Sequence, residues 1–170
     1  MTILGVEPVI RRARLAIEER LATRMDEVAK AHADGFAVPL PRPGMVPDGD
    51  YMEYDGRHED TVQFPAVAIY ATAQTARSLE AAVVASSVSL RIRILDQAEE
   101  GHTQDMFRRV WRLEAAIRDI LLYRASGLQT VENTVQLVAG NLWRASTYVQ
   151  PRTGALQCDL EFDCRLHETA

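Results

Sequence analysis

The stretch LQCDLEFDCRL, from Leu156 to Leu166, alternates strictly between apolar and polar or charged side chains. Such alternation is typical of a β-strand with one buried face, because successive side chains of a strand point to opposite sides. The outward positions include three carboxylates, Asp159, Glu161 and Asp163, which we call the acidic row. The pattern predicts a half-buried strand, and its function depends on what the acidic row contacts.

The length and composition of the chain favour a single domain over residues 1–170. The 170 residues are 47% hydrophobic and 25% charged, which is enough for one sizeable core and too little for two full domains. The formal net charge of −5 argues against a protein that binds nucleic acid through its overall field. No run of about 18 apolar residues occurs, so we expect a soluble, cytosolic protein without a membrane partner.

The basic residues and the cysteines restrict the possible chemistry. Lys30 is the only lysine, so the chain has no phosphate-binding loop of the G-x-x-x-x-G-K-[ST] type. Cys158 and Cys164 fall on the apolar side of one strand, about 20 Å apart, which is too far for a disulfide. We expect both to be buried thiols in a reducing compartment.

No residue pattern in the sequence is typical of an active site. His58 is the best candidate for a metal ligand, but its neighbours Glu59 and Asp60 would point to different sides of an extended chain. The nucleophile elbow G-x-S-x-G is absent, and acid–base catalysis needs two carboxyl groups in contrasting environments, which a regular row does not provide. The sequence therefore predicts no metal site, no cofactor and no enzymatic activity.

Hydrophobic periodicity predicts an α+β fold, a mostly antiparallel sheet of four to five strands with two long helices packed on one face. The expected elements are helix 7–33, strand 62–72, strand 87–97, helix 103–124 and three short strands between 131 and 166. Turns are expected at 139–141 and 151–154 because of their glycine, asparagine and proline residues. Residues 74–85 are compatible with either a short helix or an extension of a strand.

A long loop is expected from residue 35 to about residue 60. Its prolines Pro39, Pro41, Pro43 and Pro47 exclude a helix or a central strand. Connections are usually about 4–6 residues long, and much longer ones are commonly functional or disordered. The four prolines are candidates for docking a partner, and a disordered linker is an equally good interpretation.

Two interpretations of the acidic row remain open. Arg91 and Arg93 form a matching basic row on the outer side of the expected strand 87–97, so cross-strand ion pairing is the first. The second is that the carboxylates face something outside the monomer, such as a shared channel.

Three apolar residues of the second expected helix lie off its core-facing stripe. Phe107, Trp111 and Leu122 are roughly 80–140° away from the centre of that stripe at 100° per residue. They are either covered by the long loop or in contact with a neighbouring subunit, where aromatic residues are enriched. We favour assembly of several copies and treat these three residues as candidates for the subunit contact.

The order of these segments resembles that of the tail terminator proteins of long-tailed bacteriophages and of related particles such as gene transfer agents. The resemblance covers residues 7–167 and is one of pattern and order, without a specific motif. It rests on the amphipathic helix 7–33 and on FPAVAIYAT (64–72), VSLRIRIL (88–95), FRRVWRLEAAIRDILL (107–122) and GALQCDLEFDCRL (154–166).

The resemblance implies a ring, usually of six copies, that caps the tail tube and joins it to the neck of the particle. It implies a tail-tube partner, a neck or connector partner, no catalysis, no cofactor, and a place in the tail of a virion made in the bacterial cytoplasm. DNA would pass through the ring without specific binding, and Asp159, Glu161 and Asp163 would line its channel. The loop 35–60 is longer than the family leads us to expect.

Two alternatives to a tail terminator remain. Within the same class, the chain could be a head–tail connector component. In another class, it could be an α+β module that binds a small molecule between the sheet and the second helix.

Overall fold

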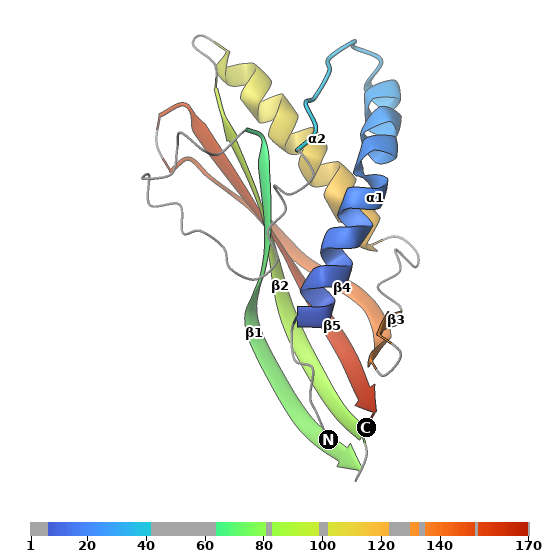
Figure 1. The fold of residues 1–170 in the computed structure, drawn as a ribbon. Coiled ribbons are helices and arrows are strands. Elements are labelled where there is room, and N and C mark those ends of the chain that lie inside the picture. Colours follow the sequence, from blue (N-terminus) through green and yellow to red (C-terminus); the bar gives the residue numbers. More distant parts are fainter. Residues whose placement is uncertain are drawn as a thin grey trace.

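The elements of the computed structural model form two layers, with both helices on one face of a curved antiparallel sheet (Figure 1). The structure describes residues 7–41, 64–80, 83–98, 102–122, 130–132, 135–151 and 153–169. The elements are α1 (Glu7–His32), β1 (Ala66–Glu80), β2 (Val83–Gln97), α2 (Thr103–Leu122), β3 (Thr130–Glu132), β4 (Val135–Val149) and β5 (Ala155–Thr169). The predicted α+β class and the predicted element order are confirmed.

The sheet has five strands in the order β1-β2-β5-β4-β3, and every neighbouring pair is antiparallel. Strand β5, which contains the stretch from Leu156 to Leu166, lies between β2 and β4. Its pairing with β2 runs without a register shift from Val83 opposite Thr169 to Gln97 opposite Ala155. The centre of the sheet is therefore regular, and this regularity fixes which side chains face each other across β2 and β5.

The hydrophobic core lies between the sheet and the helices. On the sheet side, the apolar face of β5 is buried as predicted, with Cys158, Leu160 and Cys164 fully inaccessible to solvent. On the helix side, the stripe of α2 recurs at intervals of three or four residues and is almost completely buried. That stripe consists of Met106, Val110, Leu113, Ile117, Ile120 and Leu121.

The end of α1 is set by local backbone chemistry. Ala33 and Gly35 both adopt positive φ angles, of 50° and 68°, a conformation that continues no α-helix. Between them, the carboxylate of Asp34 accepts a hydrogen bond of 3.1 Å from the backbone N–H of Phe36. The predicted stop after residue 33 is therefore correct to within one residue.

Strands β4 and β1 are both longer than the sequence pattern predicts. The expected turn at 139–141 is wrong, because β4 runs continuously from Val135 to Val149 and absorbs Gly140 and Asn141 in register shifts between Ala139 and Leu142. Bulges of this kind commonly contain glycine, which has no side chain to pack. For residues 74–85, the structure selects the strand extension, since β1 reaches Glu80 and pairs with β2 to its end.

The first residues of the predicted loop pack against the helices. Val38 is partly buried against the core, whereas Leu40 is 43% exposed. Several residues named above lie outside the described part of the chain: Pro43, Pro47, His58, Glu59 and Asp60. Neither described helix is long and apolar enough to cross a membrane.

Candidate interaction surfaces

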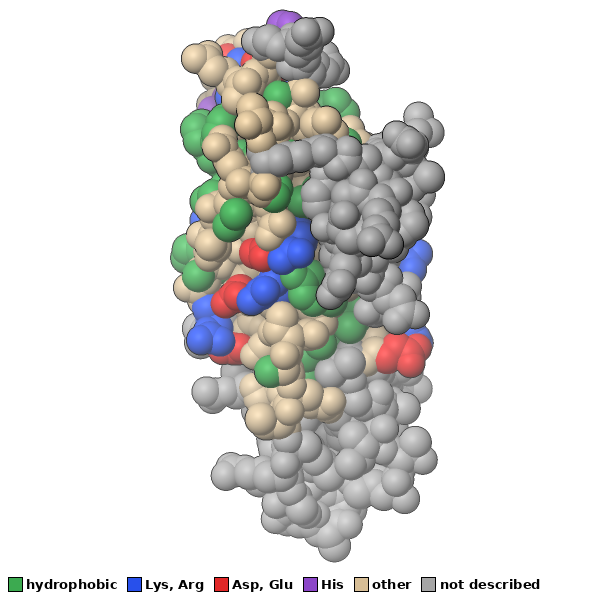
Figure 2. All heavy atoms as spheres, turned by 90° about the vertical axis from the view of Figure 1, so that its left-hand side faces the viewer, with side chains coloured by type: hydrophobic (Ala, Val, Ile, Leu, Met, Phe, Trp, Pro, Cys, Tyr) green, Lys and Arg blue, Asp and Glu red, His purple; other side chains and the backbone are tan. Residues whose placement is uncertain are grey.

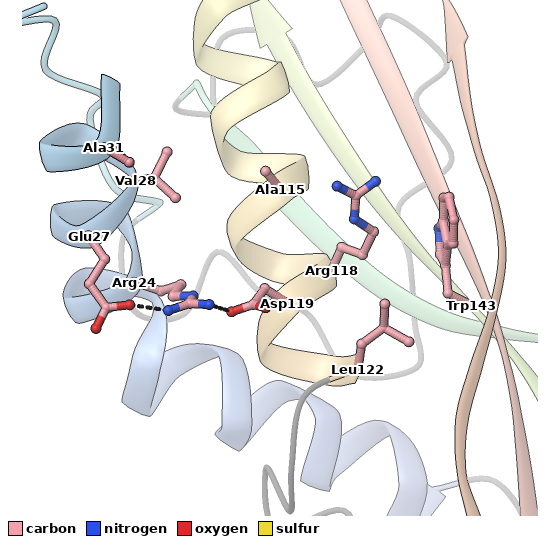
Figure 3. Close-up of a pocket in the computed structure, with 9 residues that line it drawn as sticks. All are labelled: Arg24, Glu27, Val28, Ala31, Ala115, Arg118, Asp119, Leu122 and Trp143. Carbon is pink, nitrogen blue, oxygen red and sulfur yellow. Dashed lines mark hydrogen bonds and ion pairs between the residues drawn. The ribbon is translucent and has the colours of Figure 1, made fainter. Parts of the chain in front are cut away.

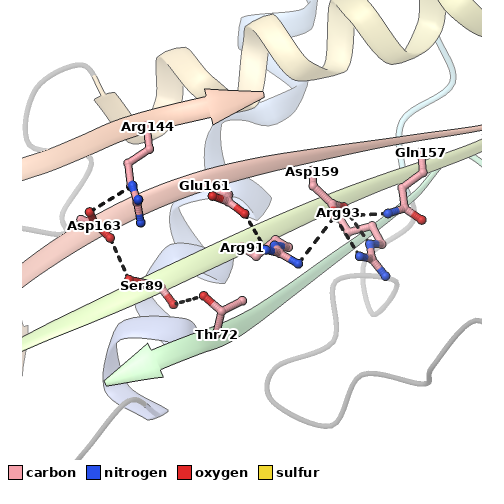
Figure 4. A network of polar contacts seen from close by, with 9 residues as sticks. All are labelled: Thr72, Ser89, Arg91, Arg93, Arg144, Gln157, Asp159, Glu161 and Asp163. Atoms are coloured by element: carbon pink, nitrogen blue, oxygen red, sulfur yellow. Dashed lines mark hydrogen bonds and ion pairs between the residues drawn. The ribbon is translucent and has the colours of Figure 1, made fainter. Parts of the chain in front are cut away.

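The outer face of the sheet carries the acidic row, and each carboxylate of that row has a cross-strand partner (Figure 4). Arg93 lies opposite Asp159 and donates hydrogen bonds of 2.7 and 2.8 Å to its two carboxylate oxygens. Arg91 lies opposite Glu161 and donates one hydrogen bond of 2.5 Å to it. The first interpretation of the acidic row, cross-strand pairing, is therefore the one that the structure shows within the monomer.

The third carboxylate of the row has weaker partners. Asp163 accepts a hydrogen bond of 2.8 Å from the hydroxyl of Ser89 and lies 3.5 Å from Nε of Arg144 on β4. The side chain of Arg144 is 54% exposed, so water screens this ion pair strongly. We refer to Ser89, Arg91, Arg93, Arg144, Asp159, Glu161 and Asp163 together as the charge ladder.

The charge ladder is electrically balanced, with three arginines and three carboxylates. It lies on the side of the molecule away from the helices, where acidic and basic side chains sit next to each other (Figure 2). Tyr70 on β1 borders it, with the Arg93 guanidinium carbon 5.6 Å from the centre of the ring. Burial raises the pKa of Tyr70, with the negative charge of Asp159 acting in the same direction, so the phenol stays protonated at neutral pH.

A second surface feature is an open groove between α1, α2 and β4, with a volume of about 500 Å³ (Figure 3). Arg24 on α1 forms ion pairs with Glu27 on the same helix and with Asp119 on α2. On the opposite side of the groove, Arg118 of α2 lies 5.1 Å above the ring of Trp143 on β4. The groove is therefore lined by both charged and apolar side chains. The lining residues are Arg24, Glu27, Val28, Ala31, Ala115, Arg118, Asp119, Leu122 and Trp143.

The three candidates for a subunit contact differ in exposure. Phe107 and Leu122 are partly buried and pack against the hydrophobic core, and Leu122 also lines the groove. Trp111 is 52% exposed, and its ring centroid lies 5.7 Å from that of Phe107. Trp111 is thus the most accessible of the three candidates.

A polar cluster that the sequence did not predict connects α1 to α2. Asp34 forms ion pairs with both Arg108 and Arg112, and the Arg112 guanidinium donates a hydrogen bond of 2.7 Å to the carbonyl of Phe36. Arg108 also stacks 4.0 Å from the centre of the Phe36 ring. Asp34 and Arg112 are 78 positions apart, so helical periodicity alone gave no signal for this contact. The cluster holds the beginning of the long connection against α2.

A second unpredicted polar contact links α2 to β4. Glu114 is 5% exposed and accepts a hydrogen bond of 2.7 Å from the hydroxyl of Ser146. Arg118 approaches the same carboxylate to 3.1 Å. The buried carboxylate therefore has two partners, which a buried charge requires.

Cys158 and Cys164 are both free thiols buried in the core. Burial, reinforced by the charge of Glu114, raises the pKa of Cys158 to about 12. Burial also raises the pKa of Cys164 to about 12. The thiolate is the nucleophilic form, so both thiols are inert at neutral pH. Within the described ranges, no group of three or more histidine, cysteine, aspartate or glutamate residues is arranged to hold a metal ion.

Comparisons with known proteins give a likeness to solved structures only. No protein family model matches the chain, and no curated protein matches it either. A chain in a structure described as the virion of a native gene transfer agent particle aligns with a TM-score of 0.44 and 12% sequence identity. The alignment covers 82% of this chain and 84% of that chain. A likeness of this extent does not decide the function.

Proposed function

We propose that this chain is a non-catalytic structural subunit of a phage-like tail, which forms a ring that caps the tail tube and joins it to the neck. The sequence resemblance to tail terminator proteins suggests this function. The observation that carries it is the two-layer arrangement, in which both helices cover one sheet face and the other face carries the charge ladder. Such a subunit can present its polar sheet face to a channel and its helices to the outside of a ring.

In this proposal the charge ladder lines the DNA channel. The carboxylates of Asp159, Glu161 and Asp163 pair with the neighbouring arginines and so keep them from binding DNA. Arginine side chains bind phosphate groups strongly when they are free to do so. Hydrogen bonds from Arg91 to Glu161 and from Arg93 to Asp159 occupy these guanidinium groups. A balanced, internally paired surface offers a passing duplex few cations to bind, which suits passage without specific binding.

The partners in this proposal are further copies of the chain, six in the usual ring, together with a tail-tube protein and a neck or connector protein. Trp111 is an accessible candidate for the contact between copies, because half of its side chain is exposed on α2. The loop with Pro39 and Pro41 at its described beginning is a candidate for docking on the tube or the neck. Leu40, exposed between these two prolines, is an apolar side chain available for such a contact.

The decisive experiment for this function is electron microscopy of particles that carry a labelled version of the chain. The label is expected at the junction of tail tube and neck, and particles that lack the chain are expected to contain unjoined heads and tails. A label at the head side of the neck would favour the head–tail connector. Absence of the chain from every particle preparation would contradict both assignments.

A second experiment tests the channel role of the charge ladder. Replacing Asp159, Glu161 and Asp163 by Asn, Gln and Asn removes the negative charges and leaves Arg91 and Arg93 available to phosphate groups. We expect such particles to assemble and to release DNA more slowly or incompletely. A matched control replaces the exposed carboxylates Glu19 and Asp26 of α1 by Gln and Asn, outside the sheet. Normal DNA release from assembled triple-variant particles would contradict the channel role.

The alternative of a small-molecule module needs a cavity between the sheet and α2. The side chains in that position, such as Val110, Ile117 and Leu160, are completely buried against one another. The groove described above lies between α1, α2 and β4 and is open to solvent, and Arg118 stacks on Trp143 within it. No observation therefore favours this alternative over a structural subunit.

A further inference from the structure

The outermost long strands of the sheet have backbone edges without a partner among the described residues. Strand β1 pairs with β2 on one side only. Strand β4 pairs with β5 along most of its length, but with β3 only at Val135 and Gln136. Unpaired N–H and C=O groups along an edge can pair with a strand from another chain. Both edges are therefore positions where a further strand can add.

The central strands of this sheet carry more charged residues than its edge strands. Monomeric sheet proteins commonly place charges on their edge strands, because charge prevents unwanted pairing. Here the central strands β2 and β5 carry all the charged residues of the ladder except Arg144. The edge strand β4 contains one charged residue, Arg144, and β1 contains two, Arg77 and Glu80, both near its end. Both edge strands thus carry fewer charges than the central strands, and charge protects most of their length from pairing only weakly.

The second half of β4 also exposes three large apolar side chains. Trp143, Tyr148 and Val149 are 37%, 43% and 47% exposed, and together they are half of the six exposed large hydrophobic residues in the described part of the chain. Exposed apolar residues that gather on one element are typical of a contact surface. Strand β4 is therefore the edge strand with the larger exposed apolar surface.

We propose that copies of this chain join edge to edge, with β4 of one copy pairing antiparallel with β1 of the next, so that the sheet continues across the boundary. This contact would form the subunit interface of the ring, and in that respect the inference rests on the proposed function. Strand directions permit it, because β1 and β4 are three positions apart in an antiparallel sheet and so run in opposite directions. Strand β3 already pairs with the first residues of β4, and Ala66 to Ile69 of β1 are buried. The proposed register therefore places the exposed end of β4, with Thr147 and Val149, opposite the exposed middle of β1, with Ala73 and Thr75.

The competing arrangement pairs β4 with β4 of a second copy about a two-fold axis. That arrangement ends at a dimer and leaves the edge of β1 without a partner strand. Pairing β4 with β1 gives both edges a partner, and head-to-tail contacts of this kind form a ring if the rotation between copies closes. The presence of two incompletely paired edges on each copy therefore favours the head-to-tail contact.

Disulfide crosslinking distinguishes these arrangements. Ala73 and Thr75 on β1, and Thr147 and Val149 on β4, are exposed and belong to the same side of the sheet by their strand pairing. Within one copy, β1 and β4 are separated by three strand spacings, about 14 Å, which is too far for an internal disulfide. A disulfide between cysteines placed on these two strands must therefore join different copies.

Four double variants combine Ala73→Cys or Thr75→Cys on β1 with Thr147→Cys or Val149→Cys on β4. Two positions on each strand allow for neighbouring registers of the β1–β4 pairing. We expect at least one double variant to form a ladder of covalent oligomers on a non-reducing gel, in concentrated protein or in particles. The unmodified chain, whose two thiols are buried, is the control. Absence of a ladder in both preparations overturns the inference. Dimers formed as completely by Thr147→Cys alone overturn it in favour of the two-fold arrangement.

A charge variant provides an independent measurement. Thr147→Lys with Val149→Lys places two charges on the edge of β4, and Leu15→Lys with Thr23→Lys places two on the exposed face of α1 as a matched control. In light scattering, the edge variant should be reduced to the 19.0 kDa monomer under conditions where the control assembles. Equal assembly of both variants overturns the inference.

These results separate the inference from the proposed function. Crosslinking between β1 and β4 in a protein that occupies no tail junction would support the edge contact and contradict the tail role. A labelled chain at the tail junction whose double variants never crosslink would support the tail role and contradict the edge contact.

Discussion

Arg93 on β2 lies directly opposite Asp159 on β5, and its Nε and Nη2 atoms each donate a hydrogen bond to a different carboxylate oxygen. This two-point geometry is the strongest form of an ion pair between side chains. Both side chains are largely shielded from water, with 19% and 13% of their surfaces exposed. The outer face of the sheet is therefore held together at its centre by a directed contact, which water weakens less than it weakens a fully exposed pair.

Removal of the arginine from this pair should destabilise the monomer. Arg93→Ala leaves the Asp159 carboxylate shielded and without its main partner, and we expect the free energy of unfolding to fall by about 2–3 kcal/mol. Urea denaturation at pH 7 measures this change. The control Arg144→Ala removes an exposed arginine from the same face and should cost less than about 1 kcal/mol. An equal loss of unfolding free energy in the two variants would show that the two-point geometry adds no stability beyond that of an exposed ion pair.

The ion pairs of Asp34 should make stability depend on pH in the acidic range. The N–H of Phe36 first, and then Arg112 and Arg108, hold the pKa of this carboxyl well below its usual value of 3.8, against an opposing effect of burial. Because the pKa is lower in the folded chain than in the unfolded chain, the stabilisation is complete well above 3.8 and is lost as the pH falls below it.

The variant Asp34→Asn tests this dependence. We expect it to be less stable than the unmodified chain at pH 7, with a difference that shrinks as the pH is lowered from about 5 towards 2. Urea midpoints measured across that range provide the test, with Asp26→Asn on the exposed face of α1 as the control. A difference that stays constant with pH would mean that the charge of Asp34 has no part in its contribution.

Substitution of Trp111 should separate assembly from folding. The side chain is 52% exposed, so Trp111→Ala should change the free energy of unfolding of the monomer by less than about 1 kcal/mol while weakening assembly. Ile117→Ala, at a fully buried position on the same helix, should cost about 2–5 kcal/mol. Thermal unfolding and light scattering measure the two effects. A large fall in the melting temperature of Trp111→Ala would contradict a role at the contact between copies.

Both thiols should resist alkylation in the native protein. Burial raises the pKa values of Cys158 and Cys164 to about 12, so both thiols stay protonated at pH 8, and both are shielded from the reagent as well. Iodoacetamide at pH 8 should therefore modify neither residue over a time in which both react completely in urea. Mass spectrometry counts the modified thiols. Rapid modification of either cysteine without denaturant would mean that the sheet opens locally around β5.

Deletion of residues 41–49 tests whether the proline loop docks on a partner. The preceding residues 35–40 are held against the helices through Phe36 and Val38, so the fold should survive the deletion. If the loop docks, the shortened chain should join tail tubes to necks less efficiently in electron micrographs. Unchanged joining would leave the loop as a linker.

The sequence predicted the parts of this fold that depend on local periodicity. Helix α2 and the alternation of β5 were correct because both depend on which side chains face the core. The turn expected at Gly140 and Asn141 was wrong, because pairing with β5 continues through the bulge and outweighs the turn propensity of these two residues. Tertiary pairing decided between helix and strand for residues 74–85 in the same way.

For the surfaces, the sequence supplied the residues and the structure supplied their partners. The row of Arg91 and Arg93 and the acidic row could be matched as one of two interpretations, because both follow strict alternation on neighbouring strands. The contact of Asp34 with Arg112 could not be predicted, since it depends on how two helices cross. Which surface meets another molecule also depends on edges and exposure, and neither can be read from periodicity.

The position of β5 in the sheet has a consequence for synthesis on the ribosome. It is the last of the described strands to be translated, yet it lies between β2 and β4 and pairs with both along most of its length. Until it emerges, the β1–β2 hairpin has no sheet connection to β4, and the apolar faces of the helices lack the centre of their packing surface. We therefore expect the nascent chain to acquire its sheet in one late step, after residue 155 has left the exit tunnel, so that a chain truncated before β5 would be a substrate for chaperones and proteases.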